Sequence, residues 1–225
     1  MQADVEVCVL QTYKRAHSQR IMAGMTAPQS RDTSELPRVT VEVPVLSIGA
    51  GPTDYEDLGR HVDALRKPGS LHMTLLHIGI LERLAADIFA WTKGRMPAER
   101  AALEIATWLR ELPVLDGFLG KSDTILTLGG GRISSLEVVV PQAVHDYQTL
   151  LLQGLHVLLD DLGLDYIDDF ILSSPALGYR SPHWIPHVAV GKARAKHQEP
   201  IKIETLALEF GTSRIRNEMS LPSVV

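Results

Sequence analysis

The chain has 225 residues, of which 45% are hydrophobic and 22% are charged, a composition typical of a folded globular protein. Its formal net charge of −5 argues against a protein that binds long duplex nucleic acid, because such proteins present a strongly basic surface to the phosphates. A local basic pocket for a small phosphate ester stays compatible with this charge.

The sequence contains one cysteine, Cys8, so no disulfide can form within the chain and a zinc site built from several cysteines is excluded. No apolar run approaches the roughly 18–20 residues that cross a bilayer. The first residues also lack the basic and apolar segments of a signal peptide. We therefore expect a cytoplasmic protein that is not associated with a membrane.

The first half of the chain predicts an N-terminal extension followed by strands and helices. Residues 1–38 form an extension of unclear role, with a short strand within 1–10 and a polar loop after it. Residues 39–48 alternate and are rich in β-branched side chains, which predicts a strand that Pro44 places at a sheet edge or breaks in two. Further expected elements are a strand over 71–78 and helices over 81–89 and 97–112.

The second half predicts a hairpin, a long helix and two more strands. Two β-rich runs, 124–128 and 135–140, flank three consecutive glycines, which indicates a β-hairpin. The other expected elements are a helix over 142–162 and strands over 184–190 and 203–210. Because the strands do not alternate strictly with helices, this order favours an α+β fold with a mostly antiparallel sheet and helices packed outside it.

Three short patterns resemble known sites but lack a necessary part. The two glycines of residues 47–52 are not followed by the third glycine of a dinucleotide-binding turn, because that position is Asp54. The glycines at 129–131 are not followed by the Lys and Ser or Thr of a phosphate-binding loop, so a flexible hairpin turn is the better interpretation, and a position at the border of a pocket stays open. His183 and His187 have metal-binding spacing for a helix, but Pro182 and Pro186 argue against a helix there.

Two of the expected strands carry a histidine in the same local pattern. His72 is followed two residues later by Thr74, and His187 is followed two residues later by Ala189. Side chains two residues apart in a strand point to the same face, so each histidine should project together with its second residue. His77 follows His72 by five residues, an odd number. In a regular strand we therefore expect its side chain to point to the opposite face.

Two imidazoles that face one cleft can perform general acid–base catalysis near neutral pH. One deprotonates a nucleophile while the other protonates the leaving oxygen. A hydroxyl such as that of Thr74 can hold a phosphate oxygen, and protein donors can stabilise the developing charge without a metal ion. His72 and His187 are therefore the candidate catalytic residues, and no metal ion or cofactor is expected.

The sequence here resembles the 2H phosphoesterase superfamily, which includes the bacterial RNA ligase and cyclic phosphodiesterase enzymes. Its two His-x-Thr/Ser-x motifs match residues 72–75 fully and residues 187–190 except for Ala189, which lacks the hydroxyl. The resemblance covers residues 40–212 and implies a two-lobed fold over 39–225 with both motifs in a central cleft. It also implies hydrolysis of a 2′,3′-cyclic phosphate, a 2′–5′ linkage or a cyclic oligonucleotide, with RNA ligation as a reverse reaction.

The residues before the second motif have two interpretations. Tyr179, Arg180 and Trp184 can grip a base and a phosphate of the substrate, or they form a surface loop whose Trp184 fills the core. Together with Thr74 and Ala189 of the two motifs, these three residues are the candidate substrate-binding residues. The acidic cluster at 160–169 is interpreted as a solvated turn after the long helix.

Three hypotheses follow from these patterns. The first is a phosphodiesterase that acts on a small nucleotide or an RNA end, and the second is a nucleotide- or RNA-end-binding module that has weak or lost catalysis because of Ala189. The third is a structural or interaction protein with coincidental histidines. We expect no long duplex partner, and a monomer rather than an oligomer, although no motif fixes the oligomeric state.

Overall fold

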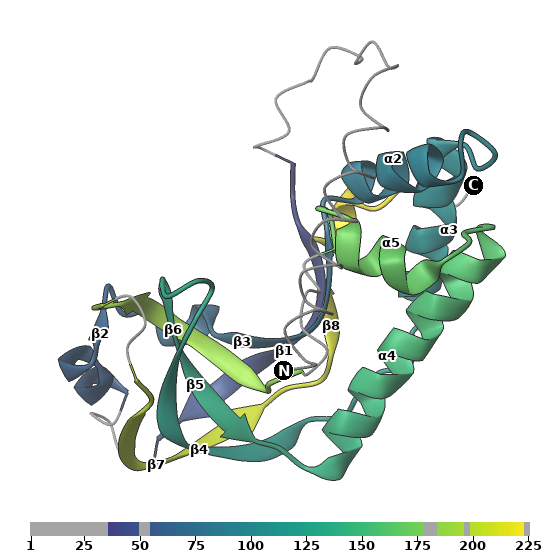
Figure 1. The fold of residues 1–225 in the computed structure, drawn as a ribbon. Helices are drawn as coiled ribbons and strands as arrows, with labels where there is room; N and C mark the ends of the chain where they lie inside the picture. The colour runs from purple at the N-terminus through teal and green to yellow at the C-terminus, as the bar shows by residue number, and fades with distance from the viewer. Residues whose placement is uncertain (1–35, 50–54, 178–183, 196–198, 223–225) are drawn as a thin grey trace, which may run out of the picture. The chain divides into compact units, whose positions relative to one another are not determined.

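The computed structural model describes residues 36–49, 55–177, 184–195 and 199–222 (Figure 1). The strand expected within residues 1–10 and nearly all of the extension 1–38 lie outside these ranges, as do Tyr179 and Arg180. The description below therefore concerns the part of the chain that begins near Pro37.

The described residues contain eight strands and four α-helices, which are mixed along the chain. The strands are β1 Val39–Ile48, β2 Val62–Asp63, β3 His72–Gly79, β4 Phe118–Leu128, β5 Ile133–Val139, β6 His187–Ala193, β7 Ile201–Phe210 and β8 Arg214–Arg216. The helices are α2 Leu81–Trp91, α3 Ala98–Arg110, α4 Gln142–Asp161 and α5 Ile167–Ser173. Short 3₁₀ turns occupy Glu56–Arg60, Pro68–Ser70 and Glu218–Ser220.

All eight strands belong to one sheet in which every pairing is antiparallel. The order is β2-β6-β3-β1-β7-β4-β5, β8 pairs with β1, and β6 also pairs with β5. These pairings join six strands into a closed ring, in which β3 and β6 are neighbours. The predicted α+β class with a mostly antiparallel sheet is confirmed, and the two motif strands lie side by side.

The helices cover the outer side of the sheet next to β3. Both α2 and α4 contact β3, α2 packs on α3, and α4 contacts α3 and α5 (Figure 1). Apolar residues at helical spacing, such as Leu84 and Ile88 on α2 and Leu151 and Leu155 on α4, are fully buried in the shared core. No helix among the described residues is long and apolar enough to span a bilayer.

The acidic segment after α4 differs from the turn expected from the sequence. Asp168 and Asp169 lie in the first turn of α5, and Phe170 and Ile171 in the same helix are buried. Carboxylates at a helix N-terminus interact favourably with the helix dipole, whereas carboxylates at the C-terminus of α4, from which a solvated turn is predicted, gain nothing from it. The segment is thus the start of a helix whose apolar side anchors it in the core.

Pro44 neither ends nor divides β1, contrary to the expectation from its missing N–H. On one side, residues 39–44 of β1 pair with β3. On the other side, residues 40–42 pair with β8 and residues 45–48 pair with β7. Pro44 lies between these two partners, and its carbonyl accepts a hydrogen bond from the Gly211 N–H at 2.9 Å. A backbone N–H, which proline lacks, is therefore not needed at Pro44 to hydrogen-bond a neighbouring strand.

Both motif strands carry an extra residue at the last position of the motif. Val41 pairs with Leu76 and Glu42 with Thr74, so Leu75 is the extra residue of β3. In the pairing of β5 with β6, Gly191 and Ala189 face consecutive residues of β5, so Val190 is the extra residue of β6. Such a bulge reverses the in-and-out parity of every residue that follows it.

Gly79 at the end of β3 provides a test of this packing. Its φ is +80°, and a Cβ atom there would collide with the carbonyl group of Ala176. We expect Gly79→Ala to lower the free energy of unfolding by about 2–4 kcal/mol, from backbone strain and overpacking together. Urea denaturation measures this loss.

Gly69→Ala is the matched control for this variant. Gly69 lies before β3, has no positive φ, and has open space where a Cβ atom would be added. Its free energy of unfolding should stay within about 0.5 kcal/mol of the wild type. Equal stability of the two variants would contradict the close packing of Gly79 on Ala176.

Candidate active site

The two motif histidines lie on one face of the paired strands β3 and β6. Met73 of β3 pairs with Val188 of β6, and both side chains are fully buried in the core. In an antiparallel ladder the residues on either side of this pair point to the opposite face. His72 therefore lies across from Ala189, and Thr74 lies across from His187. All four are half-buried, as expected for residues that border a solvent-accessible site.

The two histidines are held in the same way. Nδ1 of His72 lies 3.1 Å from the carbonyl oxygen of Ser70, and Nδ1 of His187 lies 2.7 Å from that of Ile185. A carbonyl oxygen can only accept, so Nδ1 carries the proton in each ring. Each Nε2 is then the nitrogen that can accept a proton when the ring is neutral and donate it when the ring is charged.

A cavity of about 630 Å³ lies at the first motif. It is lined by His72 and Thr74, by the cations Arg38, Arg66 and Arg216, and by Thr40, Ser70, His77 and Asn217. Directly opposed residues of an antiparallel pair have Cβ atoms about 5 Å apart, so His187 lies beside this cavity, next to Thr74. Polar and cationic lining of this kind suits an anionic ligand.

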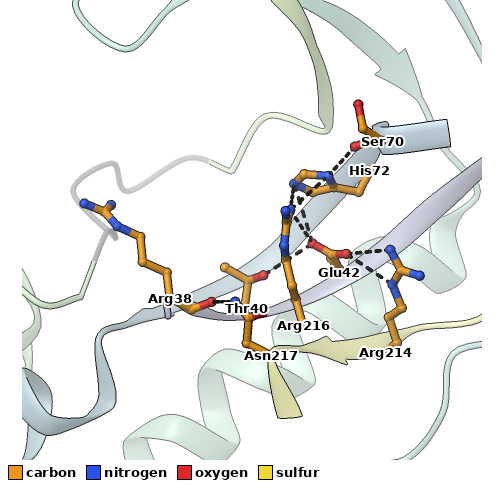
Figure 2. A network of polar contacts seen from close by, with 8 residues as sticks. All are labelled: Arg38, Thr40, Glu42, Ser70, His72, Arg214, Arg216 and Asn217. Carbon is orange, nitrogen blue, oxygen red and sulfur yellow. Dashed lines mark hydrogen bonds and ion pairs between the residues drawn. The ribbon is translucent and has the colours of Figure 1, made fainter. Parts of the chain in front are cut away.

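A buried carboxylate organises the cations around His72 (Figure 2). The side chain of Glu42 has no exposed surface, and its Oε1 accepts hydrogen bonds from Nε and Nη2 of Arg214 at 3.1 and 2.9 Å. Its Oε2 lies 3.5 Å from Nε2 of His72 and 3.6 Å from Nη1 of Arg216. A buried charge requires such partners, because an unpaired carboxylate is strongly disfavoured in the interior.

The strand register brings this network together. Glu42 of β1 pairs with Thr74 of β3 on one side and with Arg214 of β8 on the other. Arg216 follows two residues after Arg214 and therefore points to the same face, where its Nη1 lies 3.4 Å from Nε2 of His72. His72 thus has a carboxylate and a guanidinium within reach of the same nitrogen.

His77 points into the cavity, which corrects the expectation from its parity. The extra residue Leu75 reverses the alternation of β3, so His77 returns to the face of His72 and Thr74 and pairs with Thr40. Its Nδ1 is buried and has no hydrogen-bond partner among the described residues. Burial, together with the nearby charge of Arg38, lowers the pKa of His77 below its usual range.

The structure describes one of the three residues expected to grip the substrate before the second motif. Trp184 is partly buried against the core, its Nε1 donates to the carbonyl oxygen of Thr74 at 3.3 Å, and its ring meets His145 edge-on. These contacts agree with the interpretation in which Trp184 fills the core. Tyr179 and Arg180 lie outside the described residues, as does His183.

Among the residues that the structure describes, no group of three or more His, Cys, Asp and Glu side chains is arranged to hold a metal ion.

Comparisons with known proteins found similarity at the level of structure. No family model matches the sequence, and no curated protein matches it. TT0787 of Thermus thermophilus matches with 13% identity and a TM-score of 0.40, over 80% of this chain and 94% of that one. A protein described as a phosphoesterase matches with 14% identity and a TM-score of 0.40, over 79% and 93%.

Escherichia coli LigT, in a complex with 3′-AMP, matches with 13% identity and a TM-score of 0.40, over 79% of this chain and 92% of that one. One of these three neighbours carries the description phosphoesterase. We infer the function of the chain from the geometry of the motifs and their surroundings.

Several site residues were missed from the sequence. Glu42 has a recognisable signal, because it is the one carboxylate within the valine-rich run of residues 39–45. Arg214 and Arg216 alternate, as two residues on one face of a strand do. The signal for Arg38 and Arg66 is weak, since both lie outside regular strands and meet the site only through the tertiary fold.

Glu42→Gln tests the organising role of the buried carboxylate. The amide keeps the size of the side chain but removes the charge that holds Arg214, Arg216 and His72. Because both arginines are about half exposed and can turn to solvent, we expect a loss of about 1–3 kcal/mol in the free energy of unfolding. Glu204→Gln, at an exposed position of β7, should leave stability unchanged. Equal effects of the two variants would contradict a structural role for Glu42.

His77 should make the protein sensitive to acid. Its pKa is lower in the folded state than in the unfolded chain, whose value is near 6.5. As the pH falls through 6.5 the unfolded chain therefore takes up the proton first, and the folded state loses stability. We expect His77→Leu to weaken the fall in the free energy of unfolding between pH 7 and pH 5. His156→Gln, on the exposed side of α4, controls for loss of an imidazole, and an unchanged slope in His77→Leu would contradict the burial of this ring.

Proposed function

We propose that the chain is a metal-independent phosphodiesterase in which His72 and His187 form the general acid–base pair. The observation that carries this proposal is the matched bonding of the two rings. Each donates Nδ1–H to a main-chain carbonyl two residues earlier, and each belongs to the same face of β3 and β6. Two fixed imidazoles, each with its Nδ1 bound to the main chain and its Nε2 left for proton transfer, are the groups that such a displacement requires, and Nε2 of His72 also lies near Glu42 and Arg216.

The proposed reaction is an in-line displacement at phosphorus. One imidazole accepts the proton of the attacking water or ribose hydroxyl, and the new P–O bond forms as the other imidazolium gives its proton to the leaving oxygen. Arg216, beside Nε2 of His72, stabilises the negative charge on the phosphate oxygens. The Thr74 hydroxyl, which lines the same cavity, donates to one of these oxygens. Protein groups thus supply each proton and each charge of the step.

The size and charge of the cavity favour a small anionic substrate. A volume of about 630 Å³ lies in the range of small-molecule pockets, and three arginines line it. We therefore propose a substrate with a cyclic phosphate, a 2′–5′ linkage, or a cyclic or short oligonucleotide phosphodiester. The net charge of −5 disfavours a long duplex. We assign this activity to residues 39–225 together with Arg38, which lines the cavity, and we assign no role in it to residues 1–37.

A second candidate is a binding module for a nucleotide or an RNA end, with weak or lost catalysis. The observation that favours it is Ala189, which faces the site across from His72 but offers no hydroxyl to the phosphate. Binding of a cyclic nucleotide without any product after long incubation would support this function over the enzyme.

Product analysis tests the proposed activity. The protein is incubated in EDTA with 2′,3′-cyclic nucleotides, 2′–5′ and 3′–5′ dinucleotides, and cyclic oligonucleotides. We expect turnover of at least one compound class, and a fall in kcat/KM of about 10²–10⁴ in both His72→Ala and His187→Ala, because each loses one proton-transfer group.

His156→Ala is the control for these variants, because this histidine lies on α4 and pairs with Asp168 rather than with a motif residue. Its kcat/KM should equal that of the wild type. Turnover that survives in either motif variant would remove that histidine from the mechanism. Absence of turnover on the whole panel, with the fold intact by circular dichroism, would refute the phosphodiesterase.

A further inference from the structure

A second cavity, of about 770 Å³, lies next to the first and is strongly basic. Its lining includes the cations Arg66, Arg132, Lys192 and Arg194, and none of the described lining residues is acidic. Gly129 and Gly131 of the hairpin turn also line it. In a chain of net charge −5, four cations around one cavity mark a place where an anion is favoured.

Lys192 belongs to the same face of β6 as the second motif. Val190 is the extra residue in the pairing with β5, so Lys192, and not Gly191, returns to the side of His187 and Ala189. Ile133, the partner of Lys192 on β5, lies two residues from Ser135, the partner of Ala189. The basic cavity is therefore a continuation of the face that carries His187.

Arg66 joins the two cavities, since it lines both. Its backbone is fixed from two sides: its N–H donates to the Val190 carbonyl at 2.8 Å, and its carbonyl accepts from the Tyr55 hydroxyl at 2.6 Å. Burial raises the pKa of Tyr55 to about 12, so this hydroxyl stays a donor at physiological pH. Arg66 thus borders both cavities from an anchored backbone.

The cations of this cavity differ in how far they are neutralised. Arg194 donates to Oδ1 of Asp63 at 3.1 Å and to the Gly59 carbonyl at 2.7 Å. Arg66, Arg132 and Lys192 form no ion pair with any residue that the structure describes. These three exposed cations have no carboxylate partner in the lining, and a bound phosphate would supply the negative charge that they lack.

We infer that Arg66, Arg132 and Lys192 form a second anion subsite, which binds a phosphate group of the substrate other than the one that is cleaved. This inference rests on the proposed phosphodiesterase function and narrows its substrate class. The substrate is a nucleotide or oligonucleotide with at least two phosphates. One phosphate binds at the two histidines, and the other binds near Lys192, further along β6. On this face of β6 the uncharged residue Ala189 lies between His187 and Lys192.

Matched substrate pairs test the subsite. Each cleavable compound of the panel that has a free 5′-hydroxyl, a 2′,3′-cyclic nucleotide or a linear dinucleotide, is compared with the same compound carrying a 5′-phosphate, in the wild type and in the double variant Arg132→Ala/Lys192→Ala. We expect kcat/KM of the wild type to be roughly tenfold higher for the phosphorylated partner, since a charge-assisted contact is lost without it. The double variant should lose this preference but cleave the unphosphorylated compound at the wild-type rate.

The double variant Arg100→Ala/Lys121→Ala removes one arginine and one lysine at exposed positions of α3 and β4, and it should keep the preference. A wild type that does not distinguish the paired compounds, or a preference that survives in Arg132→Ala/Lys192→Ala, would overturn the subsite. If no compound is cleaved, the proposed activity fails, and calorimetric binding of the paired compounds still decides the subsite. Tenfold tighter binding of the phosphorylated compound, lost in the double variant, supports it, and equal binding overturns it.

Discussion

The pairing of Met73 with Val188 is the constraint on which the candidate site depends. Both side chains are buried completely, so the strands β3 and β6 cannot rotate or shift by one residue without exposing this pair to water. Because side chains alternate along a strand, the same constraint turns His72 and His187 to the opposite face. The hydrophobic core thus fixes the orientation of the polar site, and the hydrogen bonds of the two Nδ1 atoms then fix each ring.

Much of this arrangement could be predicted from the sequence, because strand alternation and helical spacing are local signals. β1 has the predicted bounds, and the hairpin, α2, α3 and α4 lie where periodicity indicated them. The predicted α+β class is confirmed by the all-antiparallel sheet. The short strands β2 and β8 were missed, since two or three residues carry too little pattern. The acidic start of α5 was missed because its buried residues span barely two turns.

The errors at the site have two physical origins, a bulge in β3 and the pairing of strands that are distant in the sequence. The adjacent apolar residues Leu75 and Leu76 interrupt the alternation of β3, but only the pairing with β1 shows that Leu75 is an extra residue, and without that pairing His77 is assigned to the wrong face. Glu42, Arg214 and Arg216 come from two strands whose partners cannot be read from either strand alone. In contrast, the motif residues His72, Thr74, His187 and Ala189 were chosen as pairs within one strand, where alternation holds.

Among the neighbouring strands of the ring, β3 and β6 share the fewest residue pairs. A single residue pair and the indole N–H of Trp184 hold the two strands together, whereas β4 and β7 pair over seven positions. The distance between the two imidazoles therefore depends on β3 and β6, the strand pair that separates most easily. A ligand that contacts both histidines would add a link across this junction, and its binding would therefore stabilise the pairing of β3 with β6.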